Sequence, residues 1–441
     1  TSELDKIFDY AITTDGVFVG SRVIVPFGNQ KTLGFVINIK ETSSVSTSKL
    51  KPIIRVVDEI PALTKECLEL SSYVSKKYHV SRALSLRLFL TSEMRKGKVR
   101  EKCVNFIEIC VFDDDYLTAL NSIKKNAPNQ RAILEYLKDK IKEKQSILTE
   151  TYSQSAITSL IKKGFVKTVK MRVERATYKS VELQKTNVTL TEEQQNAIDV
   201  VRNSTKPTLV FGVTGSGKTE VYLRLIEDTI KEGKSAIMLV PEIALTPQMF
   251  SRLRGRFGDN CAILHSGLSS GERFDEWWRL RSGEAKIAIG ARSAVFAPLQ
   301  NLGIIIVDEE HEQSYESESS PRYVTVDLCE FRANYNGAKL VLGSATPKIE
   351  TYLKATNGEY NLAVMKDRVN GKPLPEIIIT DMRDEVRRGN PSMFSSALKY
   401  HLENTLKNGN QAMIFLNRRG YSQKIICREC GYVAKCAHCD V

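Results

Sequence analysis

The sequence predicts an α/β protein built around a parallel β-sheet and preceded by a small β-rich region. From about residue 190 onward, short continuous apolar runs such as TLVFGV and LGIIIVD alternate with helical segments. This pattern is typical of a parallel sheet that helices cover on both faces. Residues 1–60 instead alternate apolar and polar positions in short runs, which favours antiparallel strands. At 441 residues the chain has room for about three domains.

The composition indicates a globular protein of the cytoplasm. Hydrophobic residues make up 42% of the chain, and no apolar run approaches the roughly 18 residues that span a membrane, so no membrane partner is expected. Five of the nine cysteines are scattered without the spacing of a disulfide framework, which favours reduced thiols. These five are Cys67, Cys103, Cys110, Cys261 and Cys329.

The positive charge lies almost wholly in the N-terminal part of the chain. Residues 1–190 hold 32 Lys and Arg against 21 Asp and Glu, whereas the rest holds 32 against 31. This asymmetry favours a polyanion as the partner of the basic part. A solvated lysine surface would produce the same asymmetry, so charge alone leaves both interpretations open.

Two small domains are expected in this basic part. Short strand-like runs, followed by helical spacing over residues 63–90, predict a β-rich domain with a helical tail over residues 1–95. In residues 104–185, a strand, two helices and a strand pair after Gly164 form the pattern of a winged helix, a DNA-binding domain. A helical spacer with an exposed basic face is the alternative. The basic side chains there are Lys162, Lys163, Lys167, Lys170 and Arg172.

A nucleotide site is predicted where the apolar run TLVF meets the segment GVTGSGKT. The segment matches the pattern G-x-x-x-x-G-K-[ST] between a strand and a helix, in which glycines let backbone N–H groups curl around phosphates. Lys218 is expected to reach the β- and γ-phosphates, and Thr219 to bind Mg²⁺. The predicted ATP-binding residues of this segment are Gly212, Thr214, Gly215, Ser216, Gly217, Lys218 and Thr219.

A pair of carboxylates completes the prediction of ATP hydrolysis. The apolar run LGIIIVDEEH places Asp308 and Glu309 at the carboxyl end of a strand, where a parallel sheet binds its ligand. Asp308 is expected to hold the Mg²⁺ shell, and Glu309 to orient and deprotonate the attacking water. Together with Lys218, these two residues form the predicted catalytic set.

The segments DEEH and GSATP resemble the motor core of superfamily 2 helicases. The resemblance implies a RecA-like, ATP-binding helicase lobe over residues 188–368, with Gln194 of the segment LTEEQ reading adenine. It also implies that His311, Ser344 and Thr346 couple ATP chemistry to strand movement. A second lobe would begin in residues 372–426, where the runs KPLPEIIITDM and QAMIFLN predict strands around a helix.

Longer segments narrow the resemblance to the PriA family of replication-restart helicases. They are PEIALTPQ, LHSGLSSGER, IGARSAVFAPL, DEEHEQSYESESSPRY and FLNRRGYS. The resemblance implies 3′→5′ unwinding of branched or forked DNA and binding of single-stranded DNA. It also implies primosome proteins and single-stranded DNA-binding protein as partners in reloading the replicative helicase. Two alternatives stay open: another superfamily 2 translocase, or a fork-binding loading scaffold with a dispensable ATPase.

The same family implies two sets of DNA contacts. A pocket for the 3′ end of a strand would use Phe8, Asp9, Tyr10, Gly28 and Lys51. Read without the family, the two aromatic residues suit the core of a small β domain. On the helicase lobe the contacts would be Arg292, Tyr315, Arg322 and Tyr323. Arg292 also suits a structural ion pair, and the acidic stretch ESESS at residues 316–320 leaves the DNA affinity of this loop open.

Residues 427–441 contain two Cys-x-x-Cys pairs, the usual ligands of tetrahedral zinc. Only five residues separate the pairs instead of the usual 12–20 or so, which makes a self-contained site cramped. The family implies a zinc module inserted in the second lobe, with about two zinc ions whose ligand pairs combine across the module. Its first pairs would be Cys427, Cys430, Cys436 and Cys439. The 441 residues are then expected to hold one complete lobe and the start of another.

Overall fold

A computed structural model describes residues 6–95, 99, 102–124, 126–172, 175, 188–242, 247–415, 425–426, 430 and 433–434. The chain divides into two compact units, Thr1–Gly371 and Lys372–Val441. Within the described ranges, no helix combines the length and the apolar character needed to cross a membrane.

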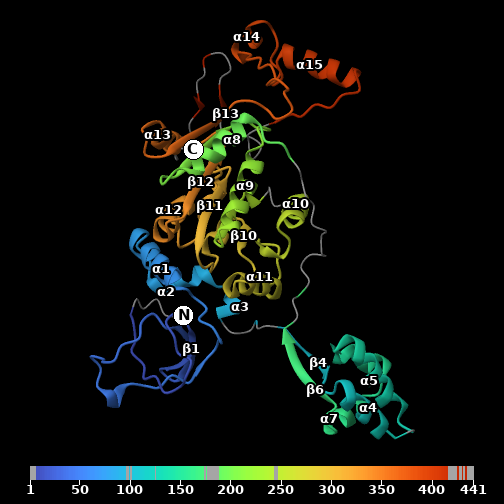
Figure 1. Cartoon of the computed structure of the whole chain (residues 1–441). Helices are drawn as coiled ribbons and strands as arrows, with labels where there is room; N and C mark the ends of the chain where they lie inside the picture. Colours follow the sequence, from blue (N-terminus) through green and yellow to red (C-terminus); the bar gives the residue numbers. More distant parts are fainter. Residues whose placement is uncertain are drawn as a thin grey trace. The chain divides into compact units, whose positions relative to one another are not determined.

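The first unit is organised by a seven-stranded parallel sheet, of which Figure 1 labels β10, β11, β12 and β13. The strand order of the sheet is β13-β7-β12-β11-β8-β10-β9. Five of these strands coincide with apolar runs that predict them, which confirms the parallel α/β fold. The sequence does not single out β13, whose short run NLAVM adjoins no motif, whereas the run CAIL of β9 leads directly into the segment LHSGLSSGER. The strands are β7 (Thr208–Gly212), β8 (Ser235–Leu239), β9 (Cys261–Leu264), β10 (Ile287–Gly290), β11 (Leu302–Asp308), β12 (Lys339–Ser344) and β13 (Asn361–Met365).

Helices cover both faces of this sheet. One face packs against α8 (Glu192–Arg202), α9 (Lys218–Lys231) and α10 (Pro247–Phe257), and the other packs against α11 (Ser270–Ser282) and α12 (Thr325–Asn336). On β8, Ala236 and Met238 join the first core whereas Ile237 and Leu239 join the second. Because both faces are buried, the strands read as continuous apolar runs rather than as alternating ones.

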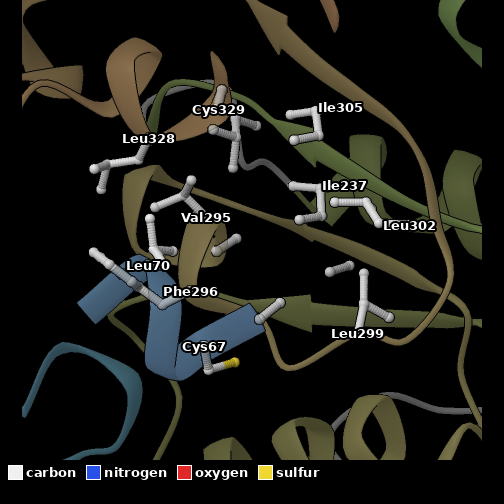
Figure 2. Packing of buried hydrophobic residues seen from close by; sticks show 14 of the residues in the cluster. Cys67, Leu70, Ile237, Val295, Phe296, Leu299, Leu302, Ile305, Leu328 and Cys329 are labelled. Atoms are coloured by element: carbon white, nitrogen blue, oxygen red, sulfur yellow. The ribbon is translucent and has the colours of Figure 1, made fainter. Parts of the chain in front are cut away.

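A small antiparallel sheet in the order β2-β1-β3 forms the N-terminal part. Its strands are β1 (Arg22–Phe27), β2 (Gln30–Phe35) and β3 (Arg55–Val56), and the helices that follow are α1 (Lys65–Lys77), α2 (Arg82–Leu86) and α3 (Ser92–Arg95). Cys67 and Leu70 of α1 lie in the same core as Phe296 and Cys329 (Figure 2). The helical tail is therefore a structural part of the seven-stranded lobe.

Residues 103–172 form another three-stranded antiparallel sheet, in the order β5-β4-β6, with helices and a core of their own. The described part contains one strand after Gly164, namely β6; the second strand of the predicted pair falls outside the described residues. The elements are β4 (Cys103–Ile109), α4 (Asp113–Ser122), α5 (Pro128–Lys140), β5 (Lys142–Lys144), α6 (Gln145–Thr151), α7 (Gln154–Lys162) and β6 (Val166–Arg172).

The second unit contains α14 (Met382–Arg387), α15 (Ser396–Lys407) and the short paired strands β14 (Ile425–Ile426) and β15 (Val433–Ala434). The strands expected at residues 372–382 and 411–417 are not formed over their described residues. Ile379 is 91% exposed and Met413 is 97% exposed, so these apolar runs have no described partner to pair with. A strand requires such a partner to satisfy its backbone groups. Of the four C-terminal cysteines only Cys430, which is exposed, lies among the described residues.

Candidate nucleotide and DNA sites

Three predicted segments meet at one edge of the parallel sheet. β7 ends at Gly212 and leads into GVTGSGKT, β11 ends at Asp308, and β12 ends at Ser344. Because β12 lies between β7 and β11 and all three run parallel, their carboxyl ends lie side by side. Ligands of open parallel sheets bind at this edge.

The phosphate-binding segment has a backbone shape that requires glycine. Gly215 and Gly217 have φ angles of +86° and +81°, in the left-handed region that side chains disfavour. A Cβ atom at Gly217 would lie only 2.2 Å from Nε2 of Gln194. Helix α9 begins directly afterwards at Lys218, so its unpaired N–H groups face the loop. This geometry suits a cradle for phosphate.

Two polar side chains of this segment turn inward. The Nζ of Lys218 donates a 2.7 Å hydrogen bond to the carbonyl oxygen of Gly212, and the lysine is only 7% exposed. The buried hydroxyl of Ser216 has no hydrogen-bond partner among the described residues. Buried polar groups are rarely left unpaired, so a phosphate oxygen fits both side chains. Thr214 and Gly215 are exposed, and Thr219 is half-buried in the first turn of α9.

Gln194 lies against the same loop. Its Oε1 accepts a 2.9 Å hydrogen bond from the N–H of Thr191, as part of a capping box at the start of α8. Its Nε2 donates to the carbonyl oxygens of Ser216 and Gly217 at 3.3 and 3.4 Å. Both ends of the carboxamide are therefore engaged with backbone, and reading adenine would require an exchange of these partners.

The two carboxylates after β11 differ in their surroundings. Burial raises the pKa of Asp308 to about 6; the negative charge of Glu309 adds to the rise and the positive charge of Lys218 opposes it. Glu309 is half-buried and has a φ angle of +47°, which is uncommon for a residue with a side chain. Such conformations cost about 1–3 kcal/mol and concentrate at functional sites. The geometry is compatible with the distinct roles predicted for the two groups.

Hydrogen bonds join the DEEH segment to the SAT segment. The Nδ1 of His311 lies 2.8 Å from Oγ of Ser344 and 3.6 Å from Oε2 of Glu309. The same Ser344 hydroxyl accepts a 2.9 Å hydrogen bond from the N–H of Thr346. A shift of the Glu309 carboxylate would therefore be transmitted to β12 through two contacts, those of His311 with Glu309 and with Ser344. Coupling of ATP chemistry to strand movement requires such a connection.

Two further residues at this edge have roles that the sequence does not reveal. Tyr222 of α9 is fully buried, and a Cβ atom at Gly343 would lie 1.6 Å from its hydroxyl, so the first residue of GSATP must be glycine. Glu310 is also fully buried and accepts hydrogen bonds from the N–H of Lys348 at 2.7 Å and from Oγ1 of Thr351 at 3.1 Å. The sequence does not reveal these roles because a tyrosine in a helix is usually an ordinary core residue. Similarly, a glutamate in the middle of DEEH is indistinguishable from a residue of an acidic turn.

Tyr315 and Tyr323 are predicted DNA contacts, yet neither ring is offered to solvent in the structure. They are only 1% and 5% exposed. The hydroxyl of Tyr315 donates a 2.7 Å hydrogen bond to the carbonyl oxygen of Asp308, and the ring of Tyr323 packs edge-on against Phe296 with centroids 5.3 Å apart. Both rings complete the core of the lobe, so neither is free to stack in this conformation.

The two arginines of the predicted DNA face differ. Arg322 is exposed, and its Nε donates a 3.2 Å hydrogen bond to the carbonyl oxygen of Glu318. Arg292 is half-buried, and its Nη1 donates to the carbonyl oxygens of Glu316 at 2.6 Å and Ser314 at 3.5 Å. Backbone carbonyls of the loop thus occupy the guanidinium that a DNA phosphate would contact.

The residues predicted for the 3′-end pocket lie on segments of the N-terminal domain that contact one another. The rings of Phe8 and Phe27 lie 5.2 Å apart, and the hydroxyl of Tyr10 donates a 3.1 Å hydrogen bond to the carbonyl oxygen of Pro26. The chain after Tyr10 runs beside Lys51, whose carbonyl oxygen accepts a 3.0 Å hydrogen bond from the N–H of Ala11.

Phe8 is 47% exposed, and Asp9 accepts a 2.5 Å hydrogen bond from the hydroxyl of Ser43. Gly28 has open space around it and a φ angle of +59°.

Two domain families match the chain at these places. The family described as the 3′DNA-binding domain (3′BD) of PriA matches residues 1–91. The family described as DEAD/DEAH box helicase matches residues 191–355. The first range covers the FDY segment, the PFG turn and Lys51, and the second covers the three segments at the sheet edge.

Replication restart protein PriA of Bacillus subtilis is 38% identical over 517 residues, which cover 100% of this chain and 64% of the relative. The protein of the same name from Haemophilus influenzae is 33% identical over 448 residues, which cover 99% of this chain and 60% of the relative. A solved structure, the helicase domain of Hef from Pyrococcus furiosus, is similar with a TM-score of 0.33 and 19% identity, covering 49% of this chain and 46% of that one.

The chain thus spans a little under two thirds of the length of these two relatives. Over that length it matches them from one end to the other, through both the N-terminal domain and the helicase lobe. Identity at this level along the whole chain, together with the two domain matches, shows that the chain belongs to the PriA family.

Proposed function

We propose that this protein is an ATP-dependent 3′→5′ DNA helicase that recognises stalled or branched replication forks and directs primosome assembly and reloading of the replicative helicase. One observation carries the proposal: GVTGSGKT, DEEH and SAT converge at one edge of the parallel sheet. The match of residues 1–91 to a 3′DNA-binding domain supports DNA as the substrate.

The residues at the sheet edge fit ATP and Mg²⁺. Lys218 would contact the β- and γ-phosphates in place of its bond to Gly212, and the unpaired Ser216 hydroxyl would gain an acceptor. Thr219 and Asp308 would hold Mg²⁺, which neutralises phosphate charge when bound. Glu309 would orient and deprotonate the attacking water.

The other assignments concern domains, zinc and partners. Residues 1–95 and 104–185 would bind DNA, residues 188–368 would form the first helicase lobe, and residues 372–426 would begin the second.

In residues 427–441, thiolates at Cys-x-x-Cys spacing support a zinc module, with Cys427, Cys430, Cys436 and Cys439 as ligands. Primosome proteins and single-stranded DNA-binding protein, in the cytoplasm, would be the partners.

DNA should stimulate ATP hydrolysis by the full-length protein severalfold, because a helicase consumes ATP as it moves along a strand. Hydrolysis would be measured without DNA, with single-stranded DNA and with a model fork, and unwinding would be followed with labelled forks of defined polarity. Hydrolysis that is indifferent to both DNAs would contradict the proposal and favour a loading scaffold or an unrelated ATPase.

Asp9→Ala should weaken binding to a fork that carries a free 3′ hydroxyl, because a carboxylate there can accept a hydrogen bond from that hydroxyl. Losing one hydrogen bond to a charged group corresponds to about 1.5–3 kcal/mol, or roughly 10- to 100-fold in affinity. Binding would be measured by fluorescence anisotropy with forks ending in a 3′ hydroxyl or a 3′ phosphate.

Ser43→Ala is the matched control, since it removes the protein's own hydrogen bond to Asp9 and leaves the carboxylate in place. It should leave the preference for the free hydroxyl intact. An equal loss for both forks in Asp9→Ala would show that the residue supports the loop alone, and would refute the pocket.

A further inference from the structure

The acidic stretch after DEEH lies where the helicase lobe is expected to meet DNA. Together with Arg292, three carboxylate residues line a pocket of about 200 Å³ at this place: Glu242, Glu316 and Glu318. One guanidinium among three carboxylates makes a poor site for a phosphate, because like charges repel it. Single-stranded DNA could approach Arg292 only if the loop changed its contacts.

Glu316 has two such contacts, each with a different cation. Its backbone carbonyl oxygen accepts the 2.6 Å hydrogen bond from Arg292. Its side-chain carboxylate lies 2.6 Å from Nζ of Lys348. One loop residue therefore holds two positive side chains that come from separate parts of the lobe.

Lys348 lies at a junction of the predicted functional segments. It follows GSATP directly and caps helix α13 (Ile349–Thr356). Its N–H donates a 2.7 Å hydrogen bond to the buried carboxylate of Glu310, and the N–H of Glu310 in turn donates to the carbonyl oxygen of Gly343 at 3.0 Å. The backbone of Lys348 is thus fixed to DEEH and β12, while its ammonium group points to the acidic loop.

The ion pair is partly exposed to solvent. The Glu316 side chain is 54% exposed and that of Lys348 is 26% exposed. Surface pairs of this kind contribute little to stability, so little free energy opposes their separation. A DNA backbone, with one charge per phosphate, competes well for such a lysine because binding releases its counterions.

We infer that Lys348 is a phosphate-binding residue for single-stranded DNA, and that Glu316 masks it until DNA arrives. The inference rests on the proposed function, since it requires a strand crossing the lobe. Displacement of the loop would free Lys348 and Arg292 together, so that a site which is acidic without DNA becomes basic with it. Without DNA, the acidic stretch thereby binds the two cations in place of a phosphate group.

The test measures the affinity of the full-length protein for a fluorescent oligo(dT) over a series of NaCl concentrations. Lys348→Gln should weaken binding and flatten the slope of log affinity against log salt by about 0.7, the share of one phosphate contact in single-stranded DNA. Glu316→Gln should strengthen binding about two- to fivefold, the range set by an exposed ion pair. The affinity for a fluorescent ADP analogue should stay unchanged in both variants, which reports an intact fold.

Two controls separate this contact from general charge. Lys354→Gln removes a lysine on the same helix whose Nζ pairs with Glu330 at 3.2 Å, and it should leave the salt slope unchanged. The double variant Glu316→Gln/Lys348→Gln should bind no more tightly than Lys348→Gln alone, because the glutamate acts through the lysine.

The outcomes are distinguishable. If wild-type protein binds oligo(dT) and Lys348→Gln leaves the slope unchanged, the inference is overturned and the proposed function stands. If Glu316→Gln strengthens binding equally with and without Lys348, the mask is overturned. A wild-type protein without affinity for oligo(dT) would remove the proposed function and this inference together.

Discussion

Lys218→Ala is expected to lower ATP hydrolysis by about 10²–10³-fold or more, the effect of losing one preorganised charge at a reacting group. Among the described residues, the Nζ of Lys218 has one hydrogen-bond partner, the carbonyl oxygen of Gly212, at the start of the phosphate-binding loop. The variant should therefore fold normally and lose the contact with the β- and γ-phosphates. Steady-state hydrolysis at saturating ATP and DNA provides the measurement.

Lys231→Ala is a suitable control because Lys231 lies on the same helix, α9, at its opposite and exposed end. It should hydrolyse ATP at the wild-type rate. Unchanged turnover in Lys218→Ala would place the nucleotide elsewhere and would remove the basis of the ATPase assignment. A parallel loss in both variants would point to the stability of α9 instead.

The sequence was most informative where a motif fixes a strand end. GVTGSGKT, DEEH and GSATP each require a strand before them, so β7, β11 and β12 could be placed and their convergence expected. β13 has no such motif, and a run of about five apolar residues does not distinguish a strand from other buried segments. Periodicity alone therefore predicted the parallel sheet but not every one of its strands.

Side-chain direction was the part that sequence could not supply. Tyr315 is a predicted DNA contact, yet its hydroxyl donates a hydrogen bond to the carbonyl oxygen of Asp308 and its ring is buried. A tyrosine suits either place, since its ring favours the core and its hydroxyl needs one partner. Long-range packing decides between them, and the same holds for Tyr222 beneath Gly343.

Long-range packing also joins the N-terminal helices to the lobe, through a buried ion pair between α1 and α12. The side chains of Arg332 and Glu66 are only 1% and 6% exposed. The Nε of Arg332 lies 2.5 Å from Oε1 of Glu66, and its Nη2 lies 3.0 Å from Oε2 of Glu66. The same guanidinium donates to the carbonyl oxygens of Val295 and Ala297 at 2.5 and 3.0 Å. The guanidinium of Arg332 thus holds in place the backbone of the short segment that begins with Arg292.

Arg332→Met is expected to lower the free energy of unfolding of the lobe by about 3–5 kcal/mol, because it leaves the carboxylate of Glu66 buried without its charge partner. Unfolding in urea would be followed by tryptophan fluorescence, since both tryptophans, Trp277 and Trp278, lie on α11 beside this core. Arg202→Met breaks the exposed pair with Asp228 and should cost less than about 1 kcal/mol.

A second substitution tests the reason for the loss. In Glu66→Leu/Arg332→Met the buried charge is gone, so the double variant should be more stable than Arg332→Met alone, although the carbonyl oxygens of Val295 and Ala297 still lack their donor. If Arg332→Met costs no more than Arg202→Met, the pair does not fasten the helical tail to the lobe. If it costs as much as expected, residues 61–95 must be kept with the helicase lobe in any shorter version of this protein, because its core would otherwise be left open to water.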